Sequence, residues 1–419
     1  MIARATSSSV NGVIIAPASK SAMQRYIAGA LLANGVSEIQ ASSLCDDVLA
    51  AIEIAGNLGA VVTIEDELLN VMGGFDPSGG EISCGESGLS ARMFTPIAAL
   101  YNGEIVMNGI GSILKRPLDM VEVPLAALGA KVTSNSGFLP LRIRGPLTGG
   151  DVTADGSVSS QFITGLLMAL PVAPQNSRIF VKNLVSRPYI DLTISILNEF
   201  GISIENDNYN IFSVKGGQKF KPGKFTCEGD WSGAAFLLVM GAIGGRVEVN
   251  GLKADSTQAD KAILEALELA GARLTTGSNS VIVEGGDLRG FDFDISDCPD
   301  LAPPLTVLAL ACKGRSVLSG AERLLAKESD RGKALEETTV KVGGNVKNHG
   351  TTIEINGGSR LKGGAADSHN DHRIAMALAV ASMLSDSPVV INRMECINKS
   401  YPGFIKDFNS IGGKLEIIK

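Results

Sequence analysis

Six short loops hold the residues of this chain that could bind anions or move protons. Each contains small polar or charged residues and leads into a strongly apolar stretch. The loops are residues 19–21, 85–88, 159–161, 229–232, 298–300 and 370–373. Such a loop is typical of a helix N-terminus, whose free N–H groups and positive dipole end attract anions. Ser and Asp are also common caps, so one loop alone could be a plain cap. Six loops with basic residues attached favour an anion-binding site.

The apolar stretches behind these loops predict a second feature, a set of buried helices. They are apolar nearly all round, which is typical of a helix with no face in water. They are residues 22–33, 89–100, 162–170, 233–243, 301–312 and 374–384. Short runs typical of β-strands, such as 104–107, 246–249 and 389–391, lie between them.

A glycine recurs after each of six further predicted helices. These glycines stand at 59, 129, 201, 271, 343 and 412, an interval of about seventy residues that indicates an internal repeat. A glycine there suits the left-handed residue that ends a helix. We expect these helices to start at Asp46-Asp47, Pro117, Asp191, Asp260, Ser329-Asp330 and Pro402. The repeat predicts an α/β fold of six βαβαββ units, three in each of two similar domains, with buried helices and outer sheets.

Composition excludes several functional classes. The 419 residues carry a formal net charge of −7, which disfavours nucleic-acid binding. The six cysteines form no CxxC pair and the three histidines form no HExxH pattern, so we expect no metal and no cofactor. The first ten residues lack an apolar signal segment. The longest apolar stretches are too short to span a membrane. We therefore expect a soluble, cytoplasmic protein with no membrane partner.

The loop motifs resemble those of the 5-enolpyruvylshikimate-3-phosphate synthases, in the enolpyruvyl transferase family. The similarity runs in order along nearly the whole chain, and the Lys-Glu-Ser-Asp-Arg and Asn-Asp-His-Arg blocks together are highly specific. The matching motifs are residues 17–21 (Pro-Ala-Ser-Lys-Ser) with Arg25, 114–117 (Leu-Lys-Arg-Pro), 158–162 (Val-Ser-Ser-Gln-Phe), 186–191 (Ser-Arg-Pro-Tyr-Ile-Asp), 327–331 (Lys-Glu-Ser-Asp-Arg), 370–373 (Asn-Asp-His-Arg) and 399–402 (Lys-Ser-Tyr-Pro).

The resemblance implies an activity and a domain arrangement. The family moves the enolpyruvyl group of phosphoenolpyruvate to the 5-hydroxyl of shikimate 3-phosphate and releases phosphate, a step of aromatic amino-acid biosynthesis that needs no metal. By analogy, residues 1–19 and 228–419 form one domain and residues 20–227 the other. The active site would lie in the cleft between them and would form by domain closure. We expect a monomer, because one chain can bind both substrates.

The resemblance also implies which residues contact each substrate. Those expected to bind phosphoenolpyruvate are Lys20, Gly88, Arg116, Gln161, Arg331, Arg373 and Lys399. Those expected to bind shikimate 3-phosphate are Lys20, Ser21, Arg25, Ser159, Ser160, Gln161, Ser186, Tyr189, Asp300 and Lys327. Arginine is suited to this task because its planar fork grips phosphate and carboxylate in pairs of hydrogen bonds.

The chemistry needs a base for the hydroxyl and an acid for the methylene carbon. The family pattern assigns the base to Asp300, which could also cap the helix that follows it. The proton at C3 could come from Glu328 or from Lys20, and the sequence does not rank them. Arg92 lies inside a predicted helix, so it could be a ligand or a buried ion-pair partner.

Two residues depart from the family pattern. Glu86 stands where asparagine is common, and its carboxylate would repel phosphate unless a cation pairs with it or it turns away. Trp231, the only tryptophan, replaces a small residue, and we expect it to pack in the core or between domains.

Three rival functions remain as alternatives. A sister enzyme acts on a UDP-sugar, UDP-N-acetylglucosamine, but it has Lys-Asn at the first motif and a loop cysteine that this chain lacks near Arg116. A six-repeat DNA clamp would need a basic surface. An inactive relative would lack catalytic side chains, and all the expected ones are present here.

Overall fold

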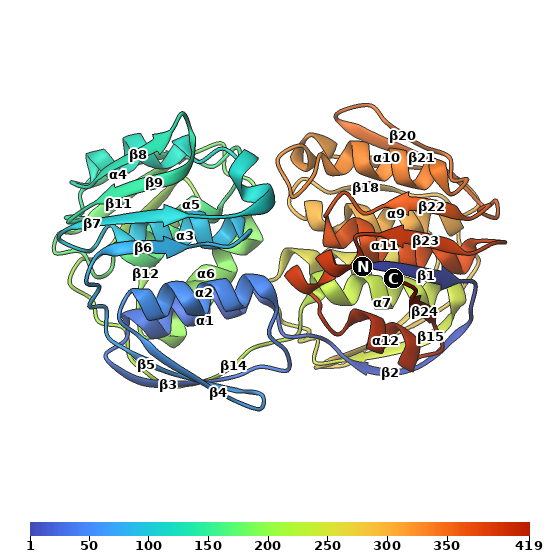
Figure 1. The fold of residues 1–419 in the computed structure, drawn as a ribbon, viewed down its shortest axis with the longest axis horizontal. Coiled ribbons are helices and arrows are strands. Elements are labelled where there is room, and N and C mark those ends of the chain that lie inside the picture. Colours follow the sequence, from blue (N-terminus) through green and yellow to red (C-terminus); the bar gives the residue numbers. More distant parts are fainter. The chain divides into compact units, whose positions relative to one another are not determined.

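The computed structural model describes residues 1–419, which divide into two compact units. Unit 1 combines Met1–Ser19 with Glu228–Lys419, and unit 2 is Lys20–Cys227. Each unit contains three four-stranded sheets around three buried helices (Figure 1). The α/β class and the six-repeat architecture expected from the sequence are confirmed.

Unit 2 buries α1 (Lys20–Leu32), α3 (Gly88–Ala98) and α5 (Gln161–Ala169). Its remaining helices are α2 (Asp46–Asn57), η1 (Gly111–Lys115), η2 (Asp119–Val121), α4 (Glu122–Ala127) and α6 (Arg187–Glu199). The sheets are, in spatial order, β14 (Lys224–Thr226), β3 (Gly35–Gln40), β5 (Leu68–Gly73), β4 (Val61–Glu65); β6 (Gly80–Ser83), β7 (Glu104–Asn108), β9 (Phe138–Arg144), β8 (Lys131–Asn135); and β10 (Asp151–Asp155), β11 (Ser177–Lys182), β13 (Ile211–Val214), β12 (Ile204–Asp207).

Unit 1 buries α7 (Trp231–Gly244), α9 (Ala302–Ala311) and α11 (His372–Ala381). Its other helices are η3 (Ala259–Ala262), α8 (Ile263–Ala270), η4 (Pro299–Leu301), η5 (Ala321–Leu324), α10 (Arg331–Lys341), η6 (Ser382–Leu384), η7 (Met394–Lys399) and α12 (Phe404–Ser410). The sheets are β16 (Arg273–Thr276), β17 (Ser280–Glu284), β15 (Gly245–Asn250), β2 (Val10–Ile15); β18 (Asp292–Asp294), β19 (Gly314–Ser319), β21 (Thr352–Gly357), β20 (Val346–Asn348); and β22 (Gly364–Asp367), β23 (Val389–Asn392), β1 (Ile2–Thr6), β24 (Lys414–Ile417).

All six sheets repeat one pairing pattern, with one parallel pair followed by two antiparallel pairs. In the second sheet of unit 2, β6 pairs parallel with β7, β7 antiparallel with β9, and β9 antiparallel with β8. Three sheets are built from continuous chain. The other three are completed by strands from elsewhere in the sequence: β14 joins β3, β2 joins β15, and β1 joins β23 and β24. The breaks in the repeat therefore coincide with the crossings between units and with the chain ends.

The six recurring glycines end helices as predicted. Each of the six glycines follows a helix and has a positive φ, from 77° at Gly201 to 113° at Gly59. An L side chain would be strained in this conformation, so glycine ends the helix at least cost.

Two predicted helix starts are wrong. Pro117 lies before its helix, because η2 begins at Asp119 and α4 at Glu122. Helix α6 begins at Arg187, with Ser186 at its N-cap in the left-handed region at φ 55°, so Asp191 lies inside the helix. The Asp191 carboxylate instead accepts a 2.9 Å hydrogen bond from the Tyr209 hydroxyl. The Ser-Arg-Pro run places proline near the first helical position, where its missing N–H costs nothing. That signal outweighs the acidic residue four positions later.

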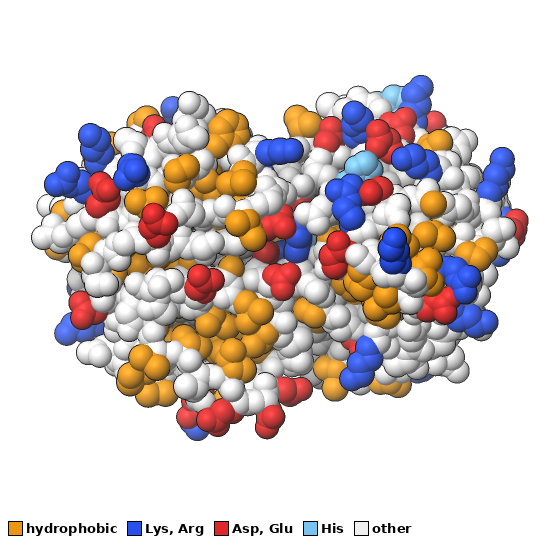
Figure 2. Space-filling model, viewed as in Figure 1, with side chains coloured by type: hydrophobic (Ala, Val, Ile, Leu, Met, Phe, Trp, Pro, Cys, Tyr) orange, Lys and Arg blue, Asp and Glu red, His pale blue; other side chains and the backbone are white.

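The buried helices form the core of each unit. Helix α7 has no exposed face over most of its length, and Trp231 at its start is fully buried within unit 1. Acidic and basic side chains are interspersed over the face in Figure 2. Several charged residues of the protein form exposed pairs, such as Arg315 with Glu354 at 2.9 Å. No helix combines the length and apolarity needed to cross a bilayer.

Candidate active site

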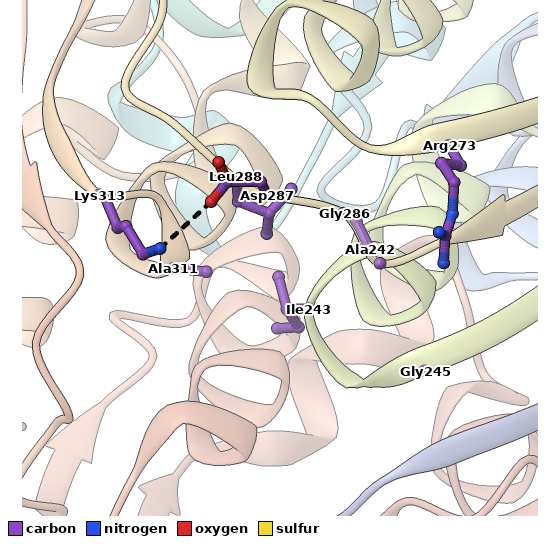
Figure 3. Close-up of a pocket in the computed structure, with 10 residues that line it drawn as sticks. Ala242, Ile243, Gly245, Arg273, Gly286, Asp287, Leu288, Ala311 and Lys313 are labelled. Atoms are coloured by element: carbon purple, nitrogen blue, oxygen red, sulfur yellow. Dashed lines mark hydrogen bonds and ion pairs between the residues drawn. The ribbon is translucent and has the colours of Figure 1, made fainter.

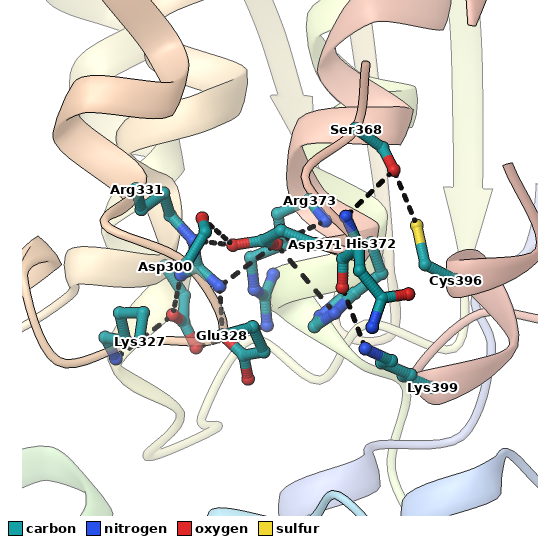
Figure 4. A network of polar contacts seen from close by, with 12 residues as sticks. Asp300, Lys327, Glu328, Arg331, Ser368, Asp371, His372, Arg373, Cys396 and Lys399 are labelled. Carbon is teal, nitrogen blue, oxygen red and sulfur yellow. Dashed lines mark hydrogen bonds and ion pairs between the residues drawn. The ribbon is translucent and has the colours of Figure 1, made fainter. Parts of the chain in front are cut away.

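Unit 1 carries a network of ion pairs centred on Arg331, the first residue of α10. Its guanidinium contacts three carboxylates: Asp300 at 2.7 Å, Glu328 at 2.5 Å and Asp371 at 2.9 Å. Figure 4 shows the three acids converging on this one side chain. Arg331 is fully buried, so all of its charge is compensated within the protein. The network fixes two carboxylates that sequence analysis singled out, Asp300 and Glu328, on one guanidinium.

Asp300 is held by three cations. Besides Arg331, the Lys327 amine lies 3.2 Å from Oδ1 and the Arg373 guanidinium 3.2 Å from Oδ2. The carboxylate is still partly exposed, whereas its arginine partners are buried. It does not act as a helix cap, because Cys298 and Leu301 occupy the cap positions of η4 and α9. The capping alternative for Asp300 is therefore wrong, and its carboxylate instead contacts Lys327, Arg331 and Arg373.

Asp371 links this network to the start of α11. Its carboxylate caps the helix by accepting the Arg373 N–H at 3.0 Å, and it also accepts the Ser329 hydroxyl at 3.0 Å. The Lys399 amine donates a hydrogen bond of 2.8 Å to the carbonyl of Asn370, the residue before Asp371. One capping residue therefore orients both Arg331 and Arg373.

The pKa values of the arginines and of the lysine in this cluster shift in opposite directions. Burial acts to lower the pKa of Arg331, but its three carboxylate partners outweigh burial and raise that pKa. The same balance raises the pKa of Arg373, mainly through Asp300. Burial lowers the pKa of Lys327 despite the nearby Asp300. The arginines are thus fixed cations, while the lysine is the group whose charge is destabilised.

A buried carboxylate lies behind the exposed one. Asp260 in η3 is almost fully buried and accepts a hydrogen bond from the Ser232 hydroxyl. Burial, reinforced by the charge of Asp300, raises the pKa of Asp260 to about 7. This side chain therefore holds a proton more readily than an ordinary aspartate.

Unit 2 presents a different arrangement around Arg25 of α1, which is also buried. Its guanidinium donates to the Thr193 hydroxyl at 2.9 Å, to the Ser21 carbonyl at 2.7 Å and to the Tyr189 carbonyl at 3.3 Å. A longer contact of 3.4 Å reaches the Thr164 hydroxyl. Burial lowers the pKa of Arg25 to about 10. All these partners are neutral, so none of them balances the charge of Arg25.

Arg92 ties α3 to α5. It is buried and donates to the Gln161 side-chain carbonyl at 2.9 Å and to the Pro117 carbonyl at 3.0 Å. Both acceptors are neutral, so the ion-pair alternative for Arg92 receives no support from these contacts. Its position instead orients Gln161 and the loop that carries Arg116.

Gly88 and Arg116 are in close contact. A Cβ built on Gly88 would lie 2.6 Å from the Arg116 guanidinium, so any side chain there would displace the arginine. The φ of Gly88 is not in the positive range. The absence of a side chain therefore matters here for the close approach of Arg116 and not for the backbone conformation.

Lys20 pairs with Asp47 at 2.8 Å, and both side chains are mostly buried.

Three further serines that are expected to bind shikimate 3-phosphate lie at helix starts of unit 2. Ser159 accepts the Gln161 N–H at 3.2 Å through its hydroxyl. Ser160 and Ser186 are buried at the N-caps of α5 and α6. The structure thus brings Ser21, Arg25, Ser159, Ser160, Gln161, Ser186 and Tyr189 to neighbouring helix starts within unit 2.

Glu86 is turned toward a second loop, the one that leads to Arg116. Its carboxylate accepts the Ser112 N–H at 2.8 Å, at the start of η1. The repulsion expected from its residue type is therefore reduced by a backbone donor.

A separate hollow of about 550 Å³ lies at the opposite ends of two buried helices. It is lined by the last residues of α7 and α9 together with Arg273, Asp287 and Lys313 (Figure 3). No residue of either cluster lines it, so this hollow is distinct from the candidate site.

Sequence reasoning missed the partners of the site residues. Asp371 is predicted only as part of a motif, Asp47 and Asp260 are predicted only as helix-start signals, and Thr193 has no predicted role. Thr193 lies 168 positions from Arg25, and no local spacing could reveal such a pair. Only Asp371 carried a signal, as the acid directly before a predicted buried helix.

Comparison with known proteins gives one consistent result. The family model described as EPSP synthase (3-phosphoshikimate 1-carboxyvinyltransferase) matches residues 5–408. A 3-phosphoshikimate 1-carboxyvinyltransferase of Clostridium novyi is 38% identical over 98% of this chain and 97% of its own length. One of Clostridioides difficile is 36% identical over 98% of this chain and 97% of its own.

A solved structure of EPSP synthase from Acinetobacter baumannii shares the fold, with a TM-score of 0.85 and 24% identity. It covers 99% of this chain and 100% of its own. The family match and the full-length relatives show that the chain belongs to the EPSP synthase (3-phosphoshikimate 1-carboxyvinyltransferase) family.

Proposed function

We propose that this chain transfers the enolpyruvyl group of phosphoenolpyruvate to the 5-hydroxyl of shikimate 3-phosphate and releases phosphate. The observation that carries the proposal is the Arg331 guanidinium between Asp300 at 2.7 Å and Glu328 at 2.5 Å. This arrangement supplies two positioned carboxylates and a cation for an anionic substrate. Family membership over nearly the whole chain supports the same reaction.

The residues divide between the two substrates. Shikimate 3-phosphate binds chiefly to the cluster around Arg25, with Asp300 and Lys327 reaching its reacting end. Phosphoenolpyruvate binds cations from both units. Its proposed ligands are Lys20, Gly88, Arg116, Gln161, Arg331, Arg373 and Lys399. We further propose that catalysis requires both units to act on one pair of substrates, and that closure excludes water.

The reaction proceeds by addition and elimination. Asp300 takes the proton of the 5-hydroxyl while the oxygen of that hydroxyl bonds to C2 of phosphoenolpyruvate. At the same time C3 gains a proton and becomes a methyl group. In the second step that methyl group loses a proton, the C2–C3 double bond returns and the bond to phosphate breaks. Glu328 and Lys20 are the candidates for the proton at C3. Both are held by a charged partner, Arg331 and Asp47 respectively.

The test is phosphate release by purified protein with phosphoenolpyruvate and shikimate 3-phosphate in metal-free buffer. We expect release only with both substrates. Removing a general base or acid costs about 10²- to 10⁴-fold, so Asp300→Ala and Lys20→Met should fall by such factors. Comparison of Glu328→Gln with Lys20→Met by solvent-proton incorporation at C3 assigns that proton. Release that does not require shikimate 3-phosphate, or none at all, would contradict the proposal.

The UDP-sugar reaction is not favoured. The matched relatives are named for 3-phosphoshikimate, and the nearest cysteine to the Arg116 loop, Cys84, is buried. Burial raises the pKa of Cys84 to about 12, which makes it a poor general acid at neutral pH. UDP-N-acetylglucosamine in place of shikimate 3-phosphate serves as the negative control in the same assay.

A further inference from the structure

Two loops of unit 2 are clasped together beside Arg116. Cys84 N–H donates to the Asn108 carbonyl at 2.9 Å, and Ile110 N–H donates to the Gly85 carbonyl at 2.8 Å. A third bond differs in kind, because the Glu86 carboxylate accepts the Ser112 N–H at 2.8 Å. A hydrogen bond to an ionised acceptor is roughly twice as strong as one between neutral groups. The side chain of Glu86 therefore provides the strongest of the three connections.

The chain leaves room for this contact at Gly111. A Cβ on Gly111 would lie 2.3 Å from the carboxylate carbon of Glu86, and φ is 62°. Any L residue there would be strained and would also displace the carboxylate. The approach of Glu86 to residue 112 is thus a fitted contact.

The clasped segment ends at a proposed substrate ligand. Helix η1 runs from Gly111 to Lys115, and Arg116 follows it directly with its guanidinium packed on Gly88. Gly88 lies two residues after Glu86. Besides their backbone hydrogen bonds, the two loops are therefore joined by two side chains, the Glu86 carboxylate at one end and the Arg116 guanidinium at the other.

We propose that Glu86 is a positioning residue, which latches residues 109–116 and so holds the Arg116 guanidinium against Gly88 in readiness for phosphoenolpyruvate. The kinetic part of this proposal rests on the proposed function, whereas the latch itself does not. The Glu86 carboxylate, whose charge would repel phosphate, thus helps to position Arg116, a proposed ligand of phosphoenolpyruvate.

The test compares variants that break the latch with variants that keep it. Glu86→Ala removes the acceptor, and Ser112→Pro removes the donor at a helix start that tolerates proline. Glu86→Gln keeps an acceptor oxygen, and Ser112→Ala keeps the N–H. Glu122→Ala is the matched control, because Glu122 also accepts a backbone N–H, that of Ser134, at 2.7 Å in the same unit.

Two readouts separate the latch from the activity. Amide hydrogen exchange of residues 109–116 should accelerate about tenfold in Glu86→Ala and Ser112→Pro, the effect of losing one positioned hydrogen bond. The KM for phosphoenolpyruvate should rise about tenfold in the same two variants, while the KM for shikimate 3-phosphate and kcat change less than about threefold. Ser112→Ala and Glu122→Ala should stay near wild type in both readouts, and Glu86→Gln should lie between wild type and Glu86→Ala, because its neutral oxygen accepts a weaker hydrogen bond.

Each contrary outcome has a distinct meaning. Unchanged exchange in Glu86→Ala would overturn the latch, whatever the activity. Faster exchange with an unchanged KM for phosphoenolpyruvate would overturn the claim that the latch positions Arg116. If the wild type lacked activity with both substrates, the proposed function would fail, and exchange would still decide the latch.

Discussion

The two clusters use opposite means to hold a buried arginine. In unit 1, Arg331 is surrounded by Asp300, Glu328 and Asp371. In unit 2, Arg25 donates to hydroxyl and carbonyl oxygens that carry no charge. The consequence is visible in the pKa values, which carboxylates raise at Arg331 and burial lowers at Arg25.

This difference indicates how each cluster contributes to the reaction. A cation among neutral dipoles keeps its charge for an incoming anion, so the cluster in unit 2 is suited to binding. A cation among carboxylates also orients those carboxylates, in addition to its proposed contact with phosphoenolpyruvate. Unit 1 is therefore suited to positioning the groups that move protons.

The largest effect should come from Arg331→Met. The substitution leaves three carboxylates together with little solvent, and breaking a buried pair in this way typically costs about 3–5 kcal/mol. Urea unfolding should show this loss, and phosphate release should fall at least about a thousandfold. Arg315→Met is the control, because its pair with Glu354 is half exposed. A loss of stability no greater than in this control would contradict the network.

Arg25→Met should separate binding from stability. Thr164 and Thr193 remain hydrogen-bonded to each other at 3.0 Å without the arginine, so unfolding should change by only about 1 kcal/mol. The KM for shikimate 3-phosphate should rise about a hundredfold, because a desolvated charge contact is lost. Steady-state kinetics beside urea unfolding checks both parts. A stability loss as large as that of Arg331→Met would remove the distinction between the clusters.

The buried acid of unit 1 should make stability depend on pH. The pKa of Asp260 is raised from 3.8 to about 7 in the folded protein, so folding favours its protonated form. Its contribution is therefore greatest at low pH and is lost as pH rises toward and through 7. The charges that act on it are those of Asp300, Arg373, Asp230 and Lys327.

Asp260→Asn tests this dependence, since the amide keeps an acceptor for the Ser232 hydroxyl but cannot ionise. Urea unfolding at pH 5.5 and pH 8 should show a decline in the wild type that is smaller in the variant. Parallel declines in the two proteins would assign the pH dependence to other groups.

The smallest effect is expected at the ion pair between Lys20 and Asp47 in unit 2. Asp47→Asn removes the charge of the carboxylate, but the amide oxygen can still accept a hydrogen bond from the lysine. A typical hydrogen bond contributes about 1 kcal/mol, so the KM for phosphoenolpyruvate should change less than about tenfold. Kinetics with each substrate varied in turn measures it. A larger change would make this pair equivalent to those of unit 1.

The sequence predicted the fold well where signals were local. The six glycines with positive φ and the six all-apolar helices each depend on residues within a few positions. The start of α6 was misplaced because a left-handed serine before Arg-Pro carries a stronger signal than Asp191.

The candidate site was predicted as a set of residues but without their partners. Motifs pointed to Arg25 and Arg331, yet the neutral surroundings of one and the carboxylates around the other come from segments up to 168 positions away. Such contacts are fixed by tertiary packing, which no spacing within a motif encodes. The orientation of Glu86 is a further case, because its acceptor role depends on a backbone N–H in another loop.

The most direct test of the division between clusters is calorimetric titration of shikimate 3-phosphate, without phosphoenolpyruvate, into wild type, Arg25→Met and Arg373→Met. We expect Arg25→Met to lose about a hundredfold in affinity, whereas Arg373→Met should bind nearly as the wild type does but should not release phosphate. Equal binding by wild type and Arg25→Met, or loss of binding only in Arg373→Met, would contradict it.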